Sequence, residues 1–381
     1  MALAALAWGL TALAVVVYSV WKPHHHTLFD LYADASRSWW AGRDLYADGT
    51  ASEFRYSPLF AVAFTPFALV EPPWGGSVWK AFGIACYLAA LMAFGRRVLG
   101  LGPGSERLSW LLVVALPLSA ISLFNGQANL VVMALVLLAL CGVGGARPGR
   151  AAVWLAAAAL VKGYPLVLVL LLSAVVSLGL LWRTALALVA GLALPLLTVP
   201  FPRGLLETQA WVALLHDTTG VRKPGYRSFD QLCRVVGFPL SPEAHLVIAL
   251  ITGALTLWLC LAFSRRHEEK GATVVYTLQL WAVWTVLFGP AAEAATYVLL
   301  APGLAWALVE AFHRPGSRAE RTLLVTSALL IGPLATDLFG GPVRRFAVDH
   351  GGLPLGGLLF LAWLASRPWS APRLDGGAHS V

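Results

Sequence analysis

The stretch "AAVWLAAAALVKGYPLVLVLLLSAVVSLGLL" (residues 151–181) decides the fold class, because it is apolar throughout except for Lys162. A helix that spans a bilayer takes about 17–25 residues, so this run is too long for one simple span. The motif VKGYP interrupts it, and proline ends or kinks a helix. We therefore expect two short helices that meet at Lys162–Pro165.

Similar apolar runs recur along the whole chain. Of the 381 residues, 59% are hydrophobic and 12% are charged, whereas a soluble domain carries about 25% charged residues. The runs do not alternate between apolar and polar residues, so they indicate helices rather than barrel strands. We expect an all-α, polytopic transmembrane protein with about 11–12 membrane helices, some of them short, interfacial or broken, in a single domain over residues 1–381. The expected apolar segments are residues 2–21, 74–95, 108–124, 127–145, 151–181, 184–201, 244–264, 272–289, 294–312, 322–338 and 352–366.

The charges give these segments a direction across the membrane. When the spans alternate, one side receives only short loops, in which Lys and Arg outnumber the acids more than two to one. Short basic loops lie in the cytoplasm, so we expect both termini and the tail 367–381 there, in a plasma-membrane protein. The outer face then carries the long loops 22–57 and 202–243, and with them the working site. The +8 net charge forms no soluble basic cluster, which predicts no nucleic-acid partner.

The first outer loop places acids among aromatic residues, in "HHHTLFDLYADASRSWWAGRDLYADG" (24–49). Asp30 and Asp34 are four residues apart and share one face if the segment is helical. Asp30 follows an apolar "TLF", so we expect partial desolvation, which raises proton affinity and suits a general base. For Asp44 and Asp48 we expect solvated loop acids, with the neighbouring Trp and Tyr residues in an interfacial belt.

Polar residues at membrane depth mark further candidate sites. The break "FNGQANL" contains the amides of Asn125 and Gln127, Lys162 lies between two apolar helices, and Glu293 follows the proline of "GPAAEAATY". Such groups are costly in a bilayer unless they find partners or face a cavity. Helix ends at a break also offer backbone donors to an anion. A locally capped turn is the alternative interpretation of the amides.

Two more segments suit a lipid and its phosphate. The apolar stretch "SPLFAVAFTPFALV" (57–70) is too short to span, which indicates either an interfacial helix that shapes a groove or a simple connector. Arg55 precedes this stretch, and we expect its guanidinium group either to pair with a phosphate or to extend to water. In "VRKPGYRSFDQLCRVVG", Arg227 and Arg234 are typical of a phosphate grip or of nonspecific attraction to anionic lipid.

Taken in order, these motifs resemble glycosyltransferase family 87. The resemblance covers about residues 1–310 and is carried by "FDLYADASRSWWAGRDLY", "FRYSPLFAVAFTPFALVEPPWGGSVW", "NGQANLVVMALVLLA", "ALVKGYPLVLVLLL", "RSFDQLCRVVG" and "GPAAEAATYVLLAPGLAW". The family's early acid falls on Asp30, and Lys162 stands at its Lys-x-x-Pro position. The late loop departs from the family, which has Trp and His between Ser-Pro and Tyr, whereas this chain has Glu293 in place of a histidine.

The resemblance implies a membrane-embedded glycosyltransferase of the GT-C class, a mannosyltransferase-like hexosyltransferase. Such an enzyme moves a sugar, mannose in the family, from a polyprenyl-phosphate donor to a glycolipid or glycan acceptor by one inverting displacement on the outer face. Because phosphate is a good leaving group, one base is enough, and the resemblance assigns that role to Asp30. We expect no cofactor and assign no metal ligand. The expected substrate-binding residues are Asp34, Arg55, Tyr56, Asn125, Gln127, Lys162, Arg227, Gln231, Arg234 and Glu293.

Two other classes of function stay open at this point. A transporter or flippase of polyprenyl-linked lipids also uses broken helices with polar residues at depth. It needs polar access from both faces, whereas the inward loops here are short and basic. A membrane scaffold without catalysis predicts that Asp30 is dispensable. All three place the chain among membrane lipids.

Overall fold

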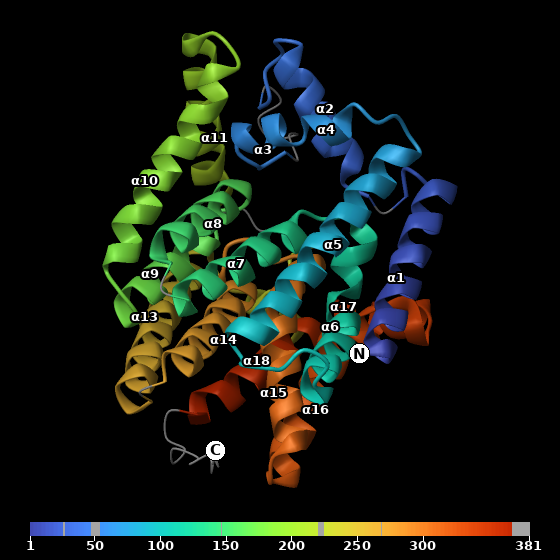
Figure 1. Cartoon of the computed structure of the whole chain (residues 1–381), viewed down its shortest axis with the longest axis vertical. Helices are drawn as coiled ribbons and strands as arrows, with labels where there is room; N and C mark the ends of the chain where they lie inside the picture. The colour runs from blue at the N-terminus through green and yellow to red at the C-terminus, as the bar shows by residue number, and fades with distance from the viewer. Residues whose placement is uncertain (26, 47–53, 146, 220–224, 268, 368–381) are drawn as a thin grey trace.

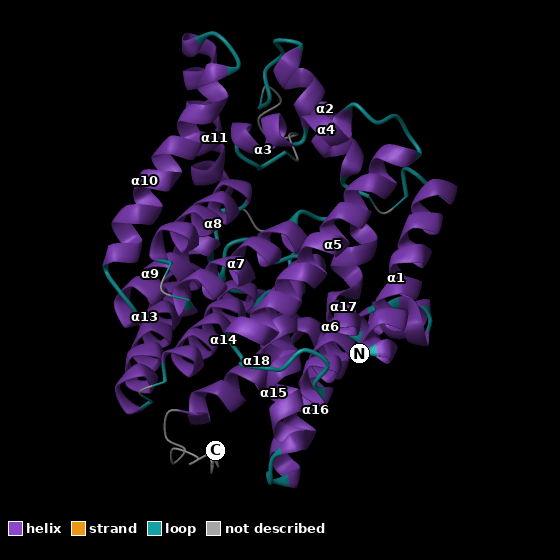
Figure 2. Cartoon of the chain, in the orientation of Figure 1, coloured by secondary structure: helices purple, strands orange, loops and turns teal. Residues whose placement is uncertain are grey.

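The computed structural model describes the chain apart from residues 26, 47–53, 146, 220–224, 268 and 368–381. The regular structure of the described residues is helical, without a strand (Figure 2). The helices are α1 (Ala2–Trp21), α2 (Phe29–Trp40), α3 (Pro58–Ala63), α4 (Thr65–Ala68), α5 (Trp74–Arg97), α6 (Glu106–Asn125), α7 (Asn129–Gly144), α8 (Pro148–Val161), α9 (Pro165–Val175), α10 (Gly179–Ala193), η1 (Leu194–Leu197), α11 (Phe201–Thr219), α12 (Phe229–Val235), α13 (Pro242–Arg266), α14 (Lys270–Phe288), η2 (Ala294–Leu300), α15 (Ala301–His313), α16 (Arg318–Ile331), η3 (Pro333–Ala335), η4 (Asp337–Phe339), α17 (Gly341–Asp349) and α18 (Gly352–Ser366).

The apolar helices confirm an all-α, polytopic membrane protein. In the described part of the chain, seven helices are long and apolar enough to cross a membrane, or eight if the bent pair α17–α18 forms one span. Helices α7, α8 and α9 are also apolar but have only 10–17 residues. The length criterion therefore gives fewer complete spans than the 11–12 helices expected, because breaks divide the apolar sequence into shorter pieces.

The helices form one bundle with a cap of short helices at one end. Figure 1 shows α2, α3 and α4 close to α11 at the top of the view, whereas the end of α15 lies at the bottom. Within the most apolar window of each span, 89% of the residues are buried in η2–α15 but only 17% in α13. The first of these therefore lies at the centre of the bundle and the second at its rim.

The break predicted at Lys162–Pro165 is confirmed. Helix α8 ends at Val161, Lys162 is extended, and α9 begins at Pro165. The indole Nε1 of Trp281 in α14 donates to the Tyr164 carbonyl at 3.0 Å, so the central helix holds this break in place.

Other boundaries differ from the sequence expectation. The segment expected over 322–338 is helical only to Ile331, because Gly332 and Pro333 end the helix and a 3₁₀ turn follows. The two long segments expected as outer loops contain more helix than expected, since α2 lies within 22–57 and α11 and α12 lie almost entirely within 202–243. The stretch 57–70 is helical as expected, in two short pieces separated at Phe64.

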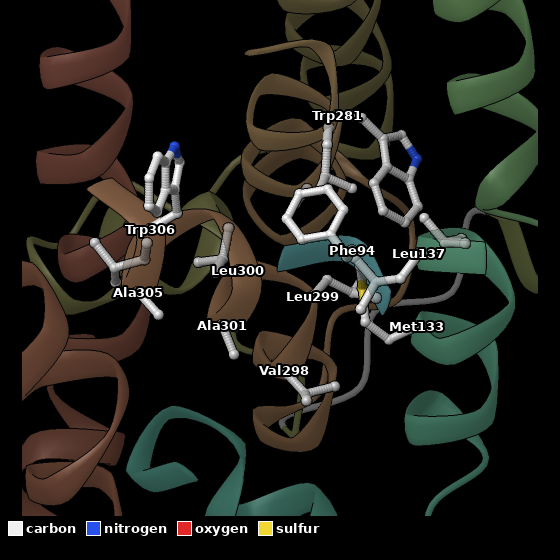
Figure 3. Packing of buried hydrophobic residues seen from close by; sticks show 14 of the residues in the cluster. Phe94, Met133, Leu137, Trp281, Val298, Leu299, Leu300, Ala301, Ala305 and Trp306 are labelled. Carbon is white, nitrogen blue, oxygen red and sulfur yellow. The ribbon is translucent and has the colours of Figure 1, made fainter. Parts of the chain in front are cut away.

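Two separate hydrophobic cores hold the molecule together. The larger core lies inside the bundle, where Phe94, Leu137 and Trp281 are fully buried (Figure 3). The smaller core is aromatic and joins the cap to the start of α5. There the Tyr32 ring lies with its centroid 5.0–6.0 Å from four neighbouring aromatic rings at steep angles, an edge-to-face arrangement that aromatic quadrupoles favour. The cap therefore has its own packing.

Helix α11 fastens the first outer segment to the bundle through a buried acid. Glu207 is 5% exposed, and its carboxylate accepts the backbone N–H of Leu45 at 3.2 Å. Burial raises the pKa of Glu207. Arg203, one turn earlier, donates to the Trp39 carbonyl at 2.9 Å. These contacts fix the end of α2 against α11.

We expect Gly356→Leu to destabilise the bundle by about 1–3 kcal/mol, the usual cost of overpacking a core. Even a Cβ at Gly356 would lie 2.8 Å from Ile331 Cγ1 and 3.0 Å from the Ser327 carbonyl, so α16 and α18 must separate. Gly9→Leu in α1 is the matched control, because nothing lies within 4 Å of that position. Thermal unfolding in detergent measures the difference, and equal midpoints for the two variants would contradict this packing.

Candidate functional site

Three breaks in the helical chain meet near the cap: the α6–α7 turn, the α8–α9 break and the α14–η2 break. Gln127 Nε2 donates to Glu293 Oε2 at 2.7 Å. Asn129 Nδ2 donates to Gln127 Oε1 and to the Ala295 carbonyl. Tyr164 Oη donates to Asn129 Oδ1 at 3.0 Å. We define the polar cluster as Gln127, Asn129, Lys162, Tyr164 and Glu293.

The local sequence explains why the chain breaks at these points. Gly126 ends α6 with a φ of 60°, in the left-handed region that favours glycine. The indole Nε1 of Trp79 donates to the Gly126 carbonyl at 2.7 Å, which ties this turn to α5. Pro165 starts α9, as the proline rule predicts. These local signals turn polar side chains inward from three separate segments.

Two tyrosines connect the polar cluster to the cap. The hydroxyls of Tyr32 and Tyr56 are hydrogen-bonded to each other at 2.7 Å, and both residues are buried. The backbone N–H of Ala128 donates to the Tyr32 hydroxyl at 3.3 Å. At the start of α2, the N–H of Leu28 donates to the Asn125 carbonyl at 3.3 Å. The first outer segment is therefore attached directly to the α6–α7 turn.

Cations surround this region. Lys162 Nζ lies 5.5 Å from the centre of the Tyr56 ring, and Glu293 and Arg55 are near enough to act on it electrostatically. Arg55 Nη1 donates to the Tyr226 hydroxyl at 2.7 Å. Arg227 is placed beside the α14–η2 break because its N–H donates to the Ala292 carbonyl, the residue before Glu293. The structure thus places Arg55, Tyr56, Gln127, Lys162, Arg227 and Glu293 in one region.

Lys80 is a further cation that the sequence interpretation missed. It lies in the second turn of α5 and is 2% exposed, yet it forms no hydrogen bond or ion pair with any described residue. The side chain of Lys80 packs on the α6–α7 turn, since a Cβ on Gly126 would lie 2.9 Å from Lys80 Cε. The sequence signal that could have found Lys80 is the one that identified Lys162: each is a lysine inside an apolar run. A buried ammonium group without a counter-charge is costly unless an anion or water reaches it.

The carboxylate of Glu293 is already engaged by the fold. It accepts from Gln127 and also takes part in a capping box, in which it accepts the N–H of Thr296 while the Thr296 hydroxyl accepts the Glu293 N–H. A carboxylate that holds a helix start and an amide is suited to positioning and to balancing the charge of Lys162. It is less suited to accepting a proton.

Asp30 lies in the first turn of α2, on a different face from Tyr32. Residues two apart on a helix point in opposite directions, so while Tyr32 packs into the cap, Asp30 points away from it. Its Oδ2 accepts from His24 Nδ1 at 2.9 Å, and its Oδ1 has no partner in the described part of the chain. The side chain is 44% exposed, so it is partly buried. Its carboxylate is accessible and held by an imidazole.

The remaining expected residues lie at the edges of the site. Asp34 is exposed and pairs with Arg37 at 3.4 Å. Gln231 is buried and donates to the carbonyls of Val348 and Asp349, which docks α12 onto α17.

Arg234 pairs with Asp230 one turn away at 3.3 Å, so it supports α12. Asn125 contributes its backbone carbonyl to Leu28. Among the described residues, no three His, Cys, Asp or Glu side chains are grouped so that they could hold a metal ion.

The arrangement is chemically asymmetric. Two lysines and two arginines approach the breaks. Of the carboxylates beside them, Glu293 is hydrogen-bonded by Gln127 and by the Thr296 N–H, and Asp349 pairs with Arg227 at 3.5 Å. An anion with several oxygens can therefore be accepted there by ammonium, guanidinium, amide and hydroxyl donors. The accessible carboxylate is Asp30, whose Oδ1 keeps no partner among the described residues.

Comparison with known proteins gives one family match, to glycosyltransferase family 87, over residues 54–290. A curated relative from Mycobacterium tuberculosis, a polyprenol-phosphate-mannose-dependent alpha-(1-2)-phosphatidylinositol mannoside mannosyltransferase, is 30% identical over 159 residues. That alignment covers 35% of this chain and 37% of the relative, so the chain spans little more than a third of its length. Among solved structures, ArnT from Cupriavidus metallidurans bound to undecaprenyl phosphate matches 96% of this chain and 77% of its own, with 16% identity and a TM-score of 0.43.

The family match covers more than half of the chain and includes α3 and α4, the α6–α7 turn, the α8–α9 break and α12, whereas α2 and Glu293 lie outside it. Four of the six motifs that carried the resemblance lie within the matched residues, while the first motif (29–46) precedes them and the last (289–306) begins at their end. That resemblance is confirmed, and the chain belongs to glycosyltransferase family 87.

Proposed function

We propose that this protein transfers a sugar from a polyprenyl-phosphate donor to a hydroxyl group of a glycolipid or glycan acceptor. The observation that carries the proposal is the excess of cations around the polar cluster. Lys80 is buried beside the cluster without a counter-charge, and Lys162 and Arg55 lie near the single carboxylate of Glu293. A sugar-linked phosphate supplies the missing negative charge. Membership in a glycosyltransferase family gives the reaction type, and the curated relative's name supports mannose as the sugar.

The proposed reaction is a single displacement at the anomeric carbon. The acceptor oxygen attacks this carbon, its proton passes to Asp30 Oδ1, and the bond to the phosphate oxygen breaks with inversion. His24 holds the other carboxylate oxygen, which fixes the orientation of Asp30. Lys80, Lys162 and Arg55 stabilise the charge that grows on the leaving phosphate. The phosphate needs no proton donor, since it leaves as an anion.

The donor's lipid chain requires an apolar surface beside the cations. The segment α3–α4 is apolar, carries prolines at both helix starts, and lies next to Arg55 and Tyr56. An apolar segment too short to span suits a position in the headgroup plane of the outer leaflet. We propose that the polar cluster faces outward and that both termini lie in the cytoplasm of a plasma-membrane protein.

We expect Asp30→Asn to lower kcat by about 10²–10⁴-fold, the usual contribution of a general base. Transfer from a polyprenyl-phospho-mannose donor by the purified protein measures this, with donor binding followed in parallel. Asp44→Asn is the matched control, because its oxygen caps the N–H of Tyr46 and an amide oxygen does the same. Normal turnover by the Asp30 variant would remove this base from the mechanism. Donor binding by the wild type without any sugar transfer would favour the flippase instead.

We expect Lys162→Ala to raise the KM for the donor about 10- to 100-fold and to change kcat much less. A hydrogen bond to a charged group contributes about 1.5–3 kcal/mol, and each 1.4 kcal/mol is tenfold in affinity. Lys22→Ala is the control, since that lysine lies over Trp21 beyond the end of α1. A lower kcat with an unchanged KM would show that Lys162 does not bind the phosphate.

The orientation predicts which positions a membrane-impermeant thiol reagent reaches in intact cells. Glu71→Cys, exposed between α4 and α5, should be labelled directly, whereas Arg150→Cys at the start of α8 should react only after the membrane is opened. The experiment uses a Cys233→Ser background, since the other three natural cysteines lie within apolar helices. The reverse labelling pattern would invert the protein in the membrane.

A further inference from the structure

A second polar cavity lies at the other end of the bundle. It has a volume of about 360 Å³ and lies between the ends of α5, α6, α13, α14, α15 and α18. Helices α6 and α14 reach both sites, since the polar cluster lies at their C-terminal ends whereas Arg107 and Glu269 of the cavity lie at their N-terminal ends. The 20 residues of α6 are about 30 Å long, the thickness of the hydrocarbon core of a bilayer.

The cavity wall carries charges of both signs. Three guanidinium groups and two carboxylates line it, from Arg107, Arg314, Arg367, Glu269 and Glu310. Arg314 pairs with Glu310 at 3.2 Å, and Arg367 lies 5.0 Å from the centre of the Trp363 ring. Arg107 is exposed and forms no hydrogen bond or ion pair with any described residue. The cations are therefore in excess over the acids.

The inner wall carries an amide whose acceptor is unused. Gln279 in the central helix α14 is 5% exposed, and its Nε2 donates to the Gly303 carbonyl at 2.8 Å. Its Oε1 accepts no hydrogen bond from the residues that the structure describes. Trp306 and Tyr276 complete the wall with aromatic surface. A ligand that enters this cavity meets guanidinium donors at the mouth and an amide acceptor at the bottom.

We propose that this cavity binds the headgroup of a phosphodiester that also carries a hydroxyl or ammonium group. The guanidinium groups match the phosphodiester oxygens, and the carboxylates and Gln279 Oε1 accept hydrogens from the hydroxyl or ammonium group. Glycerophospholipids with glycerol or ethanolamine headgroups have this chemistry, and basic pockets between membrane helices bind such headgroups. A soluble glycerophosphodiester has the same groups. The site is distinct from the polar cluster and does not depend on the sugar-transfer proposal.

Native mass spectrometry of the full chain in detergent tests the proposal. The probes are phosphatidylethanolamine, phosphatidylglycerol, phosphatidylcholine, which lacks a headgroup hydrogen-bond donor, and soluble glycerophosphoethanolamine. The variants are Arg107→Gln/Arg367→Gln and Arg107→Gln alone, whose exposed, unpaired side chain carries no part of the fold. Arg150→Gln/Arg318→Gln removes the same charge from exposed positions outside the cavity and is the matched control.

We expect the wild type and the control to retain phosphatidylethanolamine or phosphatidylglycerol at least tenfold more tightly than the double variant, and more tightly than phosphatidylcholine. Tighter binding of the soluble compound than of the lipid would identify a soluble ligand of the same chemistry. Equal retention by the wild type and the double variant, or equal retention of all three lipids, would overturn the proposal.

Discussion

The structure depends on one constraint: backbone and polar groups exposed by a helix break inside a membrane must find partners within the protein. Three breaks satisfy each other here. Gln127 reaches Glu293 across the bundle, Asn129 binds the Ala295 carbonyl, and Tyr164 completes the chain of hydrogen bonds to Asn129. Since each break supplies what another lacks, none can be straightened alone. The positions of Lys162 and Glu293 follow from this mutual arrangement.

This arrangement separates the tasks of the charged side chains. A carboxylate free to accept a proton beside Lys162 would neutralise the cation that a phosphate requires, and it would repel the phosphate. Glu293 balances part of the charge near Lys162, but its oxygens hold Gln127 and the start of η2 and are less available to accept a proton. Asp30, on the opposite side of α2 from Tyr32, keeps one oxygen open. The division favours Asp30 as the base and Glu293 as a positioning group.

How far the sequence predicts this protein depends on the physical signal of each residue. Apolar length and proline position were enough for the helical class and for the break at Lys162, because both act locally. The sequence could not show that Gln231 docks α12 onto α17, since its partners are decided by tertiary packing. The pair of Arg234 with Asp230 is four residues apart on one helix, which is a local signal that the sequence interpretation did not use. Lys80 was missed although it carries the same local signal as Lys162, because no motif marked it. The exposure of Asp30 depends on how α2 rotates against the cap, which periodicity alone does not fix.

The packing between the two polar ends bears on the difference between a transferase and a transporter. A transporter must open a polar route from one face to the other. Both ends of this bundle carry polar side chains, yet Phe94, Leu137 and Trp281 fill the space inside the bundle core and are fully buried (Figure 3). Opening a route through them would expose large apolar side chains and break the bond from Trp281 to the Tyr164 carbonyl that holds the α8–α9 break. The same bond that holds the break beside Lys162 therefore opposes a passage, which favours chemistry at one face over transport between two.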